Sequence, residues 1–323
     1  MKGTTIAIMQ KEQKDKGFVL AFLSAMTLSL TAIFIRHLTQ TYALPALVLA
    51  YWREVIVTAG LAIIFLITNP KRLRGVNGHL RFLASYGFTL ALFNGLWTLS
   101  VSLNGAAVAT VMAYSSAGFT VILGWVFLKE PLTVKKVAAA VMSMTGCAMV
   151  VNALDPAVWQ INPIGLTAGA ASGILYALYS IMGRYGAERG LDTWTTLLYI
   201  FAFASCFMLA FNLLSFGLIP GAAQTPSDMF WLGDDWQGWL ILLALALGPT
   251  LLGYGLYKAA LRFLESGITN LIVTIEPVFT AAVAYFLFGE RLSVLQISGA
   301  VLIMSAVLVL RVGGETKTAD ALE

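Results

Sequence analysis

The sequence predicts an all-α integral membrane protein with ten membrane-spanning helices in two related halves. Three observations support this fold class. The 323 residues are 59% hydrophobic and only 11% charged, which leaves too little polar surface to cover a soluble globule. Successive apolar runs of about 20 residues are each long enough to cross a bilayer. The second half of the chain then repeats the pattern of the first half.

The apolar runs are separated by short breaks that contain Pro, Gly or charged residues, such as Asn69-Pro70 and Asn162-Pro163. The expected helices cover residues 17–36, 45–68, 81–103, 106–128, 135–153, 163–183, 194–216, 238–257, 267–288 and 293–311. The first run is too long for the core of a signal peptide and lacks a convincing cleavage site. We therefore expect this run to be a membrane-spanning helix.

The internal repeat is clearest between residues 105–133 and 265–293, which align at an offset of 160. The coinciding pairs are Phe119 with Phe279, Thr120 with Thr280, Glu130 with Glu290 and Leu132 with Leu292. Earlier pairs, such as Gly17 with Gly165, align at 148, and the difference (160 − 148 = 12) matches a longer loop at residues 216–237. Because each copy has five helices, an odd number, the second copy must cross the membrane in the inverted orientation.

These boundaries divide the chain into four segments. We expect an amino-terminal segment at residues 1–16, a first repeat at 17–153, a second repeat at 163–311 and a tail at 312–323.

The distribution of basic residues predicts the topology. With the amino terminus inside, the inner segments hold Lys2, Lys11, Lys14, Lys16, Lys71, Arg72, Arg74, Arg81, Lys129, Lys135, Lys136, Arg184, Arg189, Lys258, Arg262, Arg311 and Lys317. These are 17 of the 20 basic residues, whereas only Arg36 and Arg291 lie outside and Arg53 lies within a span. The positive-inside rule therefore places both termini in the cytoplasm.

The ninth helix carries the most unusual pair of residues in the chain. Glu276 and Pro277 fall near its middle, where a carboxylate costs about 2.5–3.5 kcal/mol to insert and a proline removes a backbone hydrogen bond. Glu276 is either a binding or proton-coupling residue or a structural hydrogen-bonding partner of a neighbouring helix. The equivalent positions of the first repeat hold Ser116-Ala117, so a symmetric hinge is not assured.

Polar and aromatic residues recur on the helices that we expect around a central path. The predicted substrate-binding residues are Asn94, Trp97, Tyr114, Ser115, Tyr179, Tyr254 and Glu276, and the predicted hinge residues are Gly248, Pro249 and Pro277. Any single ring among them could instead face lipid or the core. Gly165, Gly169 and Gly173 recur every four residues and more simply predict a helix-packing surface.

This set of residues suits a small zwitterion such as an amino acid. Helix N-termini after Pro249 or Pro277 could bind a carboxylate, and Glu276 or the carbonyls of Leu245 and Val273 could accept from an ammonium group. Aromatic faces would cover the side chain and would also attract organic cations. Polyanions fit less well because Lys258 and Arg262 lie at the cytoplasmic end, and Arg53 with Glu54 lies on the second helix, outside the expected cavity.

Other protein classes find little support. No G-x-x-x-x-G-K-[ST] motif is present, and His37 and His79, the only histidines, lie at helix ends on opposite sides of the membrane, so we expect neither an ATPase nor an enzyme. A channel stays open as an alternative, although no pore-loop signature is present. Cys147 and Cys206 lie in apolar runs, so we expect no disulfide and no metal site. We also expect no cofactor and no nucleic-acid partner. The oligomeric state is not fixed, and a monomer is the working expectation.

The ten helices in two repeats, the Glu130 to Thr133 and Glu290 to Ser293 motifs and the Glu276-Pro277 pair resemble the drug/metabolite transporter superfamily. Within it, the chain is most similar to EamA-type exporters, including bacterial exporters of aromatic amino acids. The resemblance implies a central cavity among the third, fourth, eighth and ninth helices. It also implies export of amino acids and related metabolites across the bacterial inner membrane by alternating access. A multidrug or organic-cation exporter and a nucleotide-sugar-type carrier are the alternatives in the superfamily.

Overall fold

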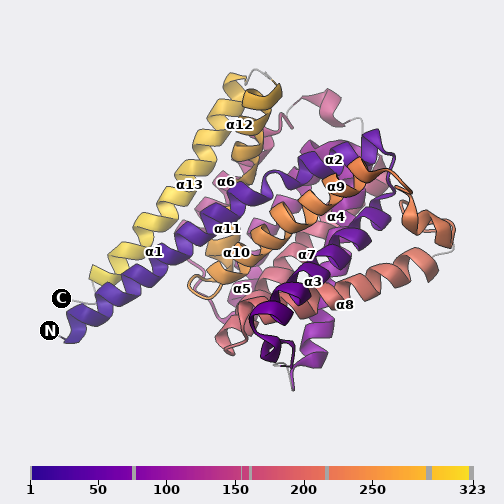
Figure 1. Cartoon of the computed structure of the whole chain (residues 1–323). Coiled ribbons are helices and arrows are strands. Elements are labelled where there is room, and N and C mark those ends of the chain that lie inside the picture. Colours follow the sequence, from indigo (N-terminus) through magenta and orange to yellow (C-terminus); the bar gives the residue numbers. More distant parts are fainter. Residues whose placement is uncertain are drawn as a thin grey trace.

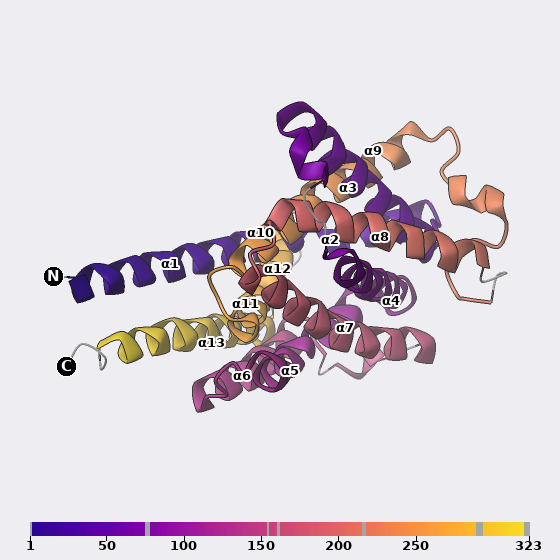
Figure 2. The same ribbon diagram turned by 90° about the horizontal axis from the view of Figure 1, so that it is seen from below.

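The computed structural model describes residues 2–74, 78–153, 155–159, 162–214, 218–288 and 293–319, and within these ranges all regular structure is helical (Figure 1). The predicted motif residues Glu290 and Leu292 lie outside the described residues. Both ends of the described chain lie at the same end of the bundle (Figures 1 and 2). This is the arrangement expected for an even number of spans.

The first repeat consists of five spans. Its helices are α1 (Lys2–Leu28), α2 (Thr31–Thr41), α3 (Ala46–Thr68), η1 (Pro70–Arg74), α4 (Leu80–Tyr114), α5 (Ser116–Leu128), α6 (Val134–Val150) and η2 (Pro156–Trp159). The α1–α2 pair forms the first span. The α4 and α5 helices together form the third and fourth spans, which are separated within α4 by Gly105 at φ 78° and ψ 166°. Glycine adopts this backbone conformation without the steric cost of a side chain.

The second repeat has the same order of spans. Its helices are α7 (Pro163–Glu188), α8 (Thr193–Leu214), η3 (Pro226–Phe230), α9 (Trp236–Leu245), η4 (Ala246–Leu252), α10 (Gly253–Ala260), α11 (Ser266–Val273), α12 (Glu276–Phe288) and α13 (Val294–Ala319). The α9, η4 and α10 helices follow one another as the eighth span. The α11 and α12 helices form the ninth span.

Length and hydropathy identify seven described helices that could cross a membrane. One of them, Leu80–Leu128, has 49 residues, which at 1.5 Å per residue is roughly 70 Å and corresponds to two crossings. The helix α6, with 17 residues, and α13, whose apolar part is Val294–Leu310, complete the set. The described helices therefore account for the ten predicted spans.

The contacts between helices have the symmetry of an inverted repeat. The α4 helix packs along α7, and α1 packs along α10. In the first contact, the third span of the first repeat (α4) packs against the first span of the second repeat (α7). In the second contact, the third span of the second repeat (α10) packs against the first span of the first repeat (α1). The two contacts are therefore equivalent, with the repeats exchanged. The pairs α3 with α8 and α6 with α13 each join equivalent spans. The two halves thus form one pseudo-symmetric bundle.

Small residues allow the close helix crossings. A Cβ atom added to Gly146 of α6 would lie 2.7 Å from the carbonyl oxygen of Gly299 on α13, and one added to Gly299 would lie 2.6 Å from that of Gly146. Cβ atoms added to Gly165, Gly169 and Gly173 would lie 2.4–2.7 Å from Asn104, Ser100 and Ser115. The predicted glycine surface of α7 is therefore a packing surface, as small residues provide in membrane helices.

Candidate functional site

Two adjacent hollows lie between the repeats. The larger one, here called the vestibule, has a volume of about 730 Å³. It is lined by α2, the start of the fourth span, the end of α6 and α12, with one residue each from α9 and α13, and its lining includes Thr110, Pro277 and Thr280. These segments lie at the end of the bundle away from the termini (Figure 1). The smaller one, here called the central pocket, has a volume of about 50 Å³ and shares Thr110 with the vestibule. It has room for a few water molecules.

The central pocket is aromatic and contains one carboxylate. Its lining consists of Leu28, Thr31, Phe93, Trp97, Thr110, Ala113, Tyr114, Tyr176, Tyr179, Tyr254, Tyr257 and Glu276. The rings of Phe93 and Tyr176 are stacked with centroids 4.8 Å apart, and those of Tyr179 and Tyr254 meet edge to face at 5.6 Å. This lining contains no lysine, arginine or histidine. The charge in the pocket is therefore that of Glu276.

Glu276 is positioned by both repeats. It lies in the first turn of α12, where the positive end of the helix dipole stabilises a carboxylate. Its Oε2 atom accepts a hydrogen bond of 2.5 Å from the hydroxyl of Tyr114, which ends α4. The structural alternative for Glu276, a hydrogen bond to a neighbouring helix, is thus realised, but within a pocket that adjoins the vestibule.

Tyr254 is held by a chain of hydrogen bonds that leads away from the pocket. Its hydroxyl donates to Oδ1 of Asn94 at 2.8 Å, and Nδ2 of Asn94 donates to Oε1 of Glu54 at 3.0 Å. Glu54 on α3 is fully buried, and so is Arg53 beside it. As expected, Arg53 and Glu54 do not line the central pocket. Glu54 nevertheless orients Asn94, which in turn accepts from Tyr254 in the lining.

These bonds determine which ligand groups the pocket can bind. The hydroxyl hydrogens of Tyr114 and Tyr254 are already donated to Glu276 and Asn94. The oxygens of both tyrosines keep lone pairs, and the carboxylate of Glu276 is an acceptor. Around these groups, the π faces of the rings attract cations. Around Glu276 the central pocket therefore offers acceptors and suits an ammonium group, whereas the hydroxyl of Tyr179, elsewhere in the lining, can also donate.

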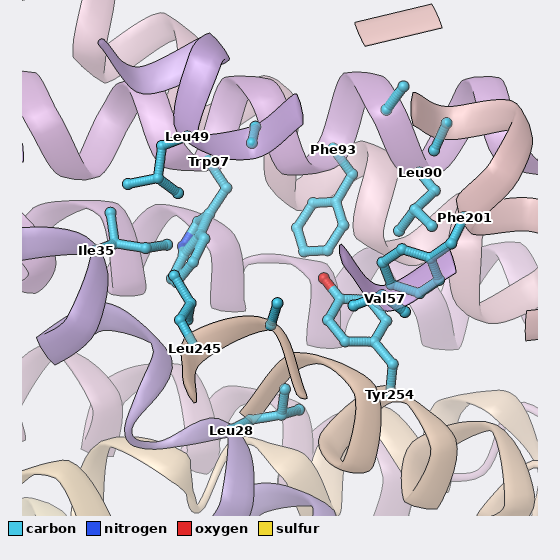
Figure 3. Packing of buried hydrophobic residues seen from close by; sticks show 14 of the residues in the cluster. Leu28, Ile35, Leu49, Val57, Leu90, Phe93, Trp97, Phe201, Leu245 and Tyr254 are labelled. Atoms are coloured by element: carbon cyan, nitrogen blue, oxygen red, sulfur yellow. The ribbon is translucent and has the colours of Figure 1, made fainter. Parts of the chain in front are cut away.

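Five of the seven predicted binding residues line the central pocket: Trp97, Tyr114, Tyr179, Tyr254 and Glu276. Figure 3 shows the Trp97 ring pointing from α4 towards Leu245, and Tyr254 pointing towards Phe93 and Phe201. Asn94 lies behind Tyr254. Ser115 lies outside both hollows, where its hydroxyl donates to the carbonyl oxygen of Met112 at 2.6 Å. A role for Ser115 in binding stays a prediction.

The predicted hinge residues lie at two irregularities of different kinds. Pro277 follows the break between α11 and α12, whereas Gly248 and Pro249 lie inside η4, a π-helix that continues into α10. In η4 the hydroxyl of Thr250 donates to the carbonyl oxygen of Leu245 at 2.9 Å. The Leu245 carbonyl, which we expected to face a ligand, is therefore occupied, and η4 has no free N-terminus for a carboxylate.

At the end where the termini lie, polar contacts hold the bundle closed. The buried carboxylate of Glu130 accepts 2.8 Å hydrogen bonds from the backbone N–H and the hydroxyl of Ser266, at the start of α11. Lys136 forms an ion pair with Glu265. Nη1 of Arg184 donates to the carbonyl oxygens of Leu261 and Leu264 at 2.9 and 3.1 Å. We call these contacts the inner closure. Of its residues, only Glu130 belongs to a motif identified in the sequence, and that motif predicts no role for it.

A polar layer lies between the inner closure and the central pocket. The hydroxyls of Ser180 and Tyr257 are 2.6 Å apart, and Nδ2 of Asn270 donates to Ser180 Oγ at 3.3 Å. Ser116 donates to Oδ1 of Asn270 at 3.2 Å, which connects the two repeats. The sequence showed these residues as isolated polar positions, because their partners are on four different helices.

The comparison with known protein families decides the identity of this bundle. Residues 15–152 and 163–312 each match the EamA-like transporter family. The chain belongs to this family. The expectation of a drug/metabolite transporter fold is thereby confirmed, and so is the expectation that the chain is a transporter and no enzyme.

The relatives are full-length matches at low identity. The chain is 28% identical over 307 residues to a probable amino-acid metabolite efflux pump of Salmonella typhimurium, covering 92% of this chain and 94% of that protein. It is 26% identical over 305 residues to a protein of the same name from Escherichia coli, covering 91% and 94%. A solved crystal structure shares the fold, with a TM-score of 0.69, 19% identity and coverage of 93% and 96%. The finer resemblance to aromatic amino acid exporters stays a prediction.

Proposed function

We propose that this EamA-family transporter exports amino acids and related amines across the bacterial inner membrane by alternating access, with both termini in the cytoplasm. The observation that carries this proposal is the central pocket, in which Glu276 is the charged group and aromatic rings surround it. The ammonium group of a substrate would bind Glu276 and the tyrosine oxygens. The side chain of the substrate would pack against Trp97 and Phe93.

The two ends of the bundle support alternating access. In this conformation the vestibule adjoins the central pocket at Thr110, while Glu130, Lys136 and Arg184 hold the other end together. With the termini in the cytoplasm, this is an outward-facing state. Because the repeats are inverted copies, exchanging their conformations produces a state that is open to the other side.

A narrow central pocket implies that the rings move when a substrate binds. At about 50 Å³ the pocket is smaller than typical ligand sites of 300–1,000 Å³, whereas the vestibule lies within that range. Tyr179 and Tyr254 meet edge to face and could separate to admit a side chain.

Liposomes that contain the pure protein test this proposal. We expect labelled neutral amino acids to exchange across these liposomes faster than across empty ones, and the exchange to saturate. No flux above that of empty vesicles for any amino acid would contradict the substrate assignment. Counterflow with and without a pH gradient then shows whether protons are coupled to transport.

A second candidate, export of organic cations, follows from the same pocket because its lining offers a carboxylate and no basic residue. Competition separates the two candidates. A quaternary ammonium compound that is itself transported, in the absence of amino acid flux, supports the organic-cation exporter. One that only inhibits amino acid exchange supports the first proposal.

A further inference from the structure

The proposed function, on which this inference rests, leaves the carboxylate of an amino acid without a partner. The first turn of α12 already contains Glu276, so a second carboxylate there would meet a like charge. At Pro249 the backbone continues through η4 into α10, which leaves no helix N-terminus. A carboxylate-binding group must therefore lie elsewhere along the path.

Lys258 on α10 is the group whose surroundings fit this role. Its side chain is only 4% exposed, and its Nζ atom lies 4.5 Å from the centre of the Tyr86 ring. Among the described residues it forms no hydrogen bond and no ion pair. A buried ammonium group without an anion is costly, and in natural structures such charges are paired or bind a ligand.

Two buried hydroxyls lie near Lys258 and have, within the described part of the chain, no hydrogen-bonding partner other than each other. They belong to Tyr86 on α4 and Tyr179 on α7, which are both fully buried with their rings 4.9 Å apart. At least one of the two hydroxyl hydrogens is therefore free to be donated to an anion. Because Gly183 lacks a Cβ atom, α7 approaches the Tyr86 hydroxyl closely; an added Cβ would lie 2.8 Å from that oxygen.

We propose that Lys258, Tyr86 and Tyr179 form a second binding site, which receives the carboxylate group of an amino acid before the ammonium group reaches Glu276. Lys258 follows Tyr254 of the central pocket by four residues, or roughly 6 Å along the helix axis, towards the inner closure. Tyr179 belongs to both sites because its ring lines the central pocket.

The order of the groups along the path explains the need for two sites. From the cytoplasmic end, a substrate passes the inner closure at Arg184 and Leu261, then meets Lys258 and the two hydroxyls, and then meets Glu276. A zwitterion finds a complementary charge at each stage. A free amine finds one only at Glu276, and a free carboxylate only at Lys258.

Three compounds that share a phenyl group test this site in proteoliposomes: L-phenylalanine, phenethylamine, which lacks the carboxylate, and 3-phenylpropanoate, which lacks the ammonium group. For Lys258→Met we expect a KM for L-phenylalanine at least 10-fold higher and unchanged transport of phenethylamine. Glu276→Gln should have the opposite effect, and of the three compounds the transport of phenethylamine should be weakened most. Arg262→Gln is the matched control, because Arg262 is an exposed cation four residues further along.

Equal loss of both L-phenylalanine and phenethylamine in a folded Lys258→Met variant, or no loss of either, would overturn the carboxylate site. Should Lys258→Met fail to fold, Tyr86→Phe, which removes only a hydroxyl and lies outside the central pocket, should raise the KM for L-phenylalanine severalfold and leave that for phenethylamine unchanged. A wild-type protein that transports none of the three compounds would contradict the proposed function. In that case thermal stabilisation of the detergent-purified protein by 3-phenylpropanoate, lost in Lys258→Met, still decides the site.

Discussion

The fourth span of each repeat breaks at the same place although the two sequences differ there. The α4 helix ends at Tyr114 and α5 begins at Ser116, whereas α11 ends at Val273 and α12 begins at Glu276. The N–H of Ser115 donates to the carbonyl oxygen of Met112 at 3.2 Å. At the positions 160 residues later, the N–H of Ile275 donates to the carbonyl oxygen of Ile272 at the same distance. Only the second repeat has a proline next to its break.

A hydroxyl stabilises both breaks. Ser115 donates to the carbonyl oxygen of Met112, and Thr274 donates to that of Leu271, both at 2.6 Å. Short polar side chains that bond to nearby carbonyls compete with the helical pattern and bend helices. The comparison teaches that the break belongs to the repeat architecture, while the carboxylate of Glu276 is a specialisation of the second copy.

Glu276→Ser makes the second repeat resemble the first and should have the largest effect. Losing the carboxylate removes the charge of the central pocket, which for a buried ionic contact corresponds to about 3 kcal/mol, or roughly 100-fold in kcat/KM for amines. Proteoliposome uptake measures this loss. Ser116→Ala is the control, and an equal loss there would mean that the two positions are functionally equivalent.

Glu130→Gln weakens the inner closure and should shift the conformational balance. The carboxylate accepts from two groups of Ser266, and losing its charge should favour the state open at the termini by about 10-fold, or ~1.4 kcal/mol. Spin labels at the exposed positions Lys135 and Arg262 would report a longer distance. Lys129→Gln, a change at the exposed neighbour, should leave the distance unchanged; an identical shift there would rule out a specific role for Glu130.

Tyr114→Phe removes the hydrogen bond between the repeats at Glu276 but keeps the ring. We expect kcat/KM for amino acids to fall about 10-fold, since one hydrogen bond to a charged group contributes roughly 1.5 kcal/mol at the lower end of its range. Tyr199→Phe, whose hydroxyl bonds to Leu73 outside the pocket, is the matched control. Unchanged transport in Tyr114→Phe would show that this bond does not position Glu276.

Pro277→Ala sharpens the comparison most directly, because the first repeat has alanine at the equivalent position and still breaks. We expect the break to persist and transport to fall less than threefold. Uptake kinetics of the variant test this expectation. A complete loss of transport in a folded Pro277→Ala protein would mean that the proline, and not the repeat architecture, determines the hinge.

Asp192→Asn should have the smallest effect, on stability alone. Asp192 precedes α8 and accepts from the N–H and hydroxyl of Thr195, whereas α3, the equivalent span, follows Pro45 without such a bond. Burial raises the pKa of Asp192, but these bonds, with Arg72 and Arg262, outweigh it and hold the pKa below its usual value. The carboxylate therefore stabilises the fold above its unfolded pKa, and this contribution is lost as the pH falls through the folded pKa.

At pH 7 we expect Asp192→Asn to cost up to about 1 kcal/mol, as for other helix caps, and less near pH 3. Thermal unfolding in detergent at the two pH values measures the difference. A larger cost at low pH than at neutral pH would contradict the depressed pKa.

Several features of this protein follow from the sequence because they are local. The spans depend on the length of apolar runs, the repeats on matching positions such as Glu130 and Glu290, and the glycine surface of α7 on a four-residue period. Glu276 stands out because a carboxylate is rare at the middle of a span. Five of the seven predicted binding residues reach the central pocket, since the stripe on α4 and the aromatic residues of α7 and α10 share helix faces.

Only the tertiary structure decides what each face meets. Helical periodicity places Asn94 and Trp97 on one side of α4, but the rotation and crossing of the neighbouring helices put Trp97 in the pocket and Asn94 between Tyr254 and Glu54. The burial of Lys258 beneath Tyr86, and the bonds from Ser266 to Glu130, likewise join residues more than 100 positions apart. Hydropathy is a property of single segments, whereas charge pairing inside a membrane bundle depends on which segments lie together.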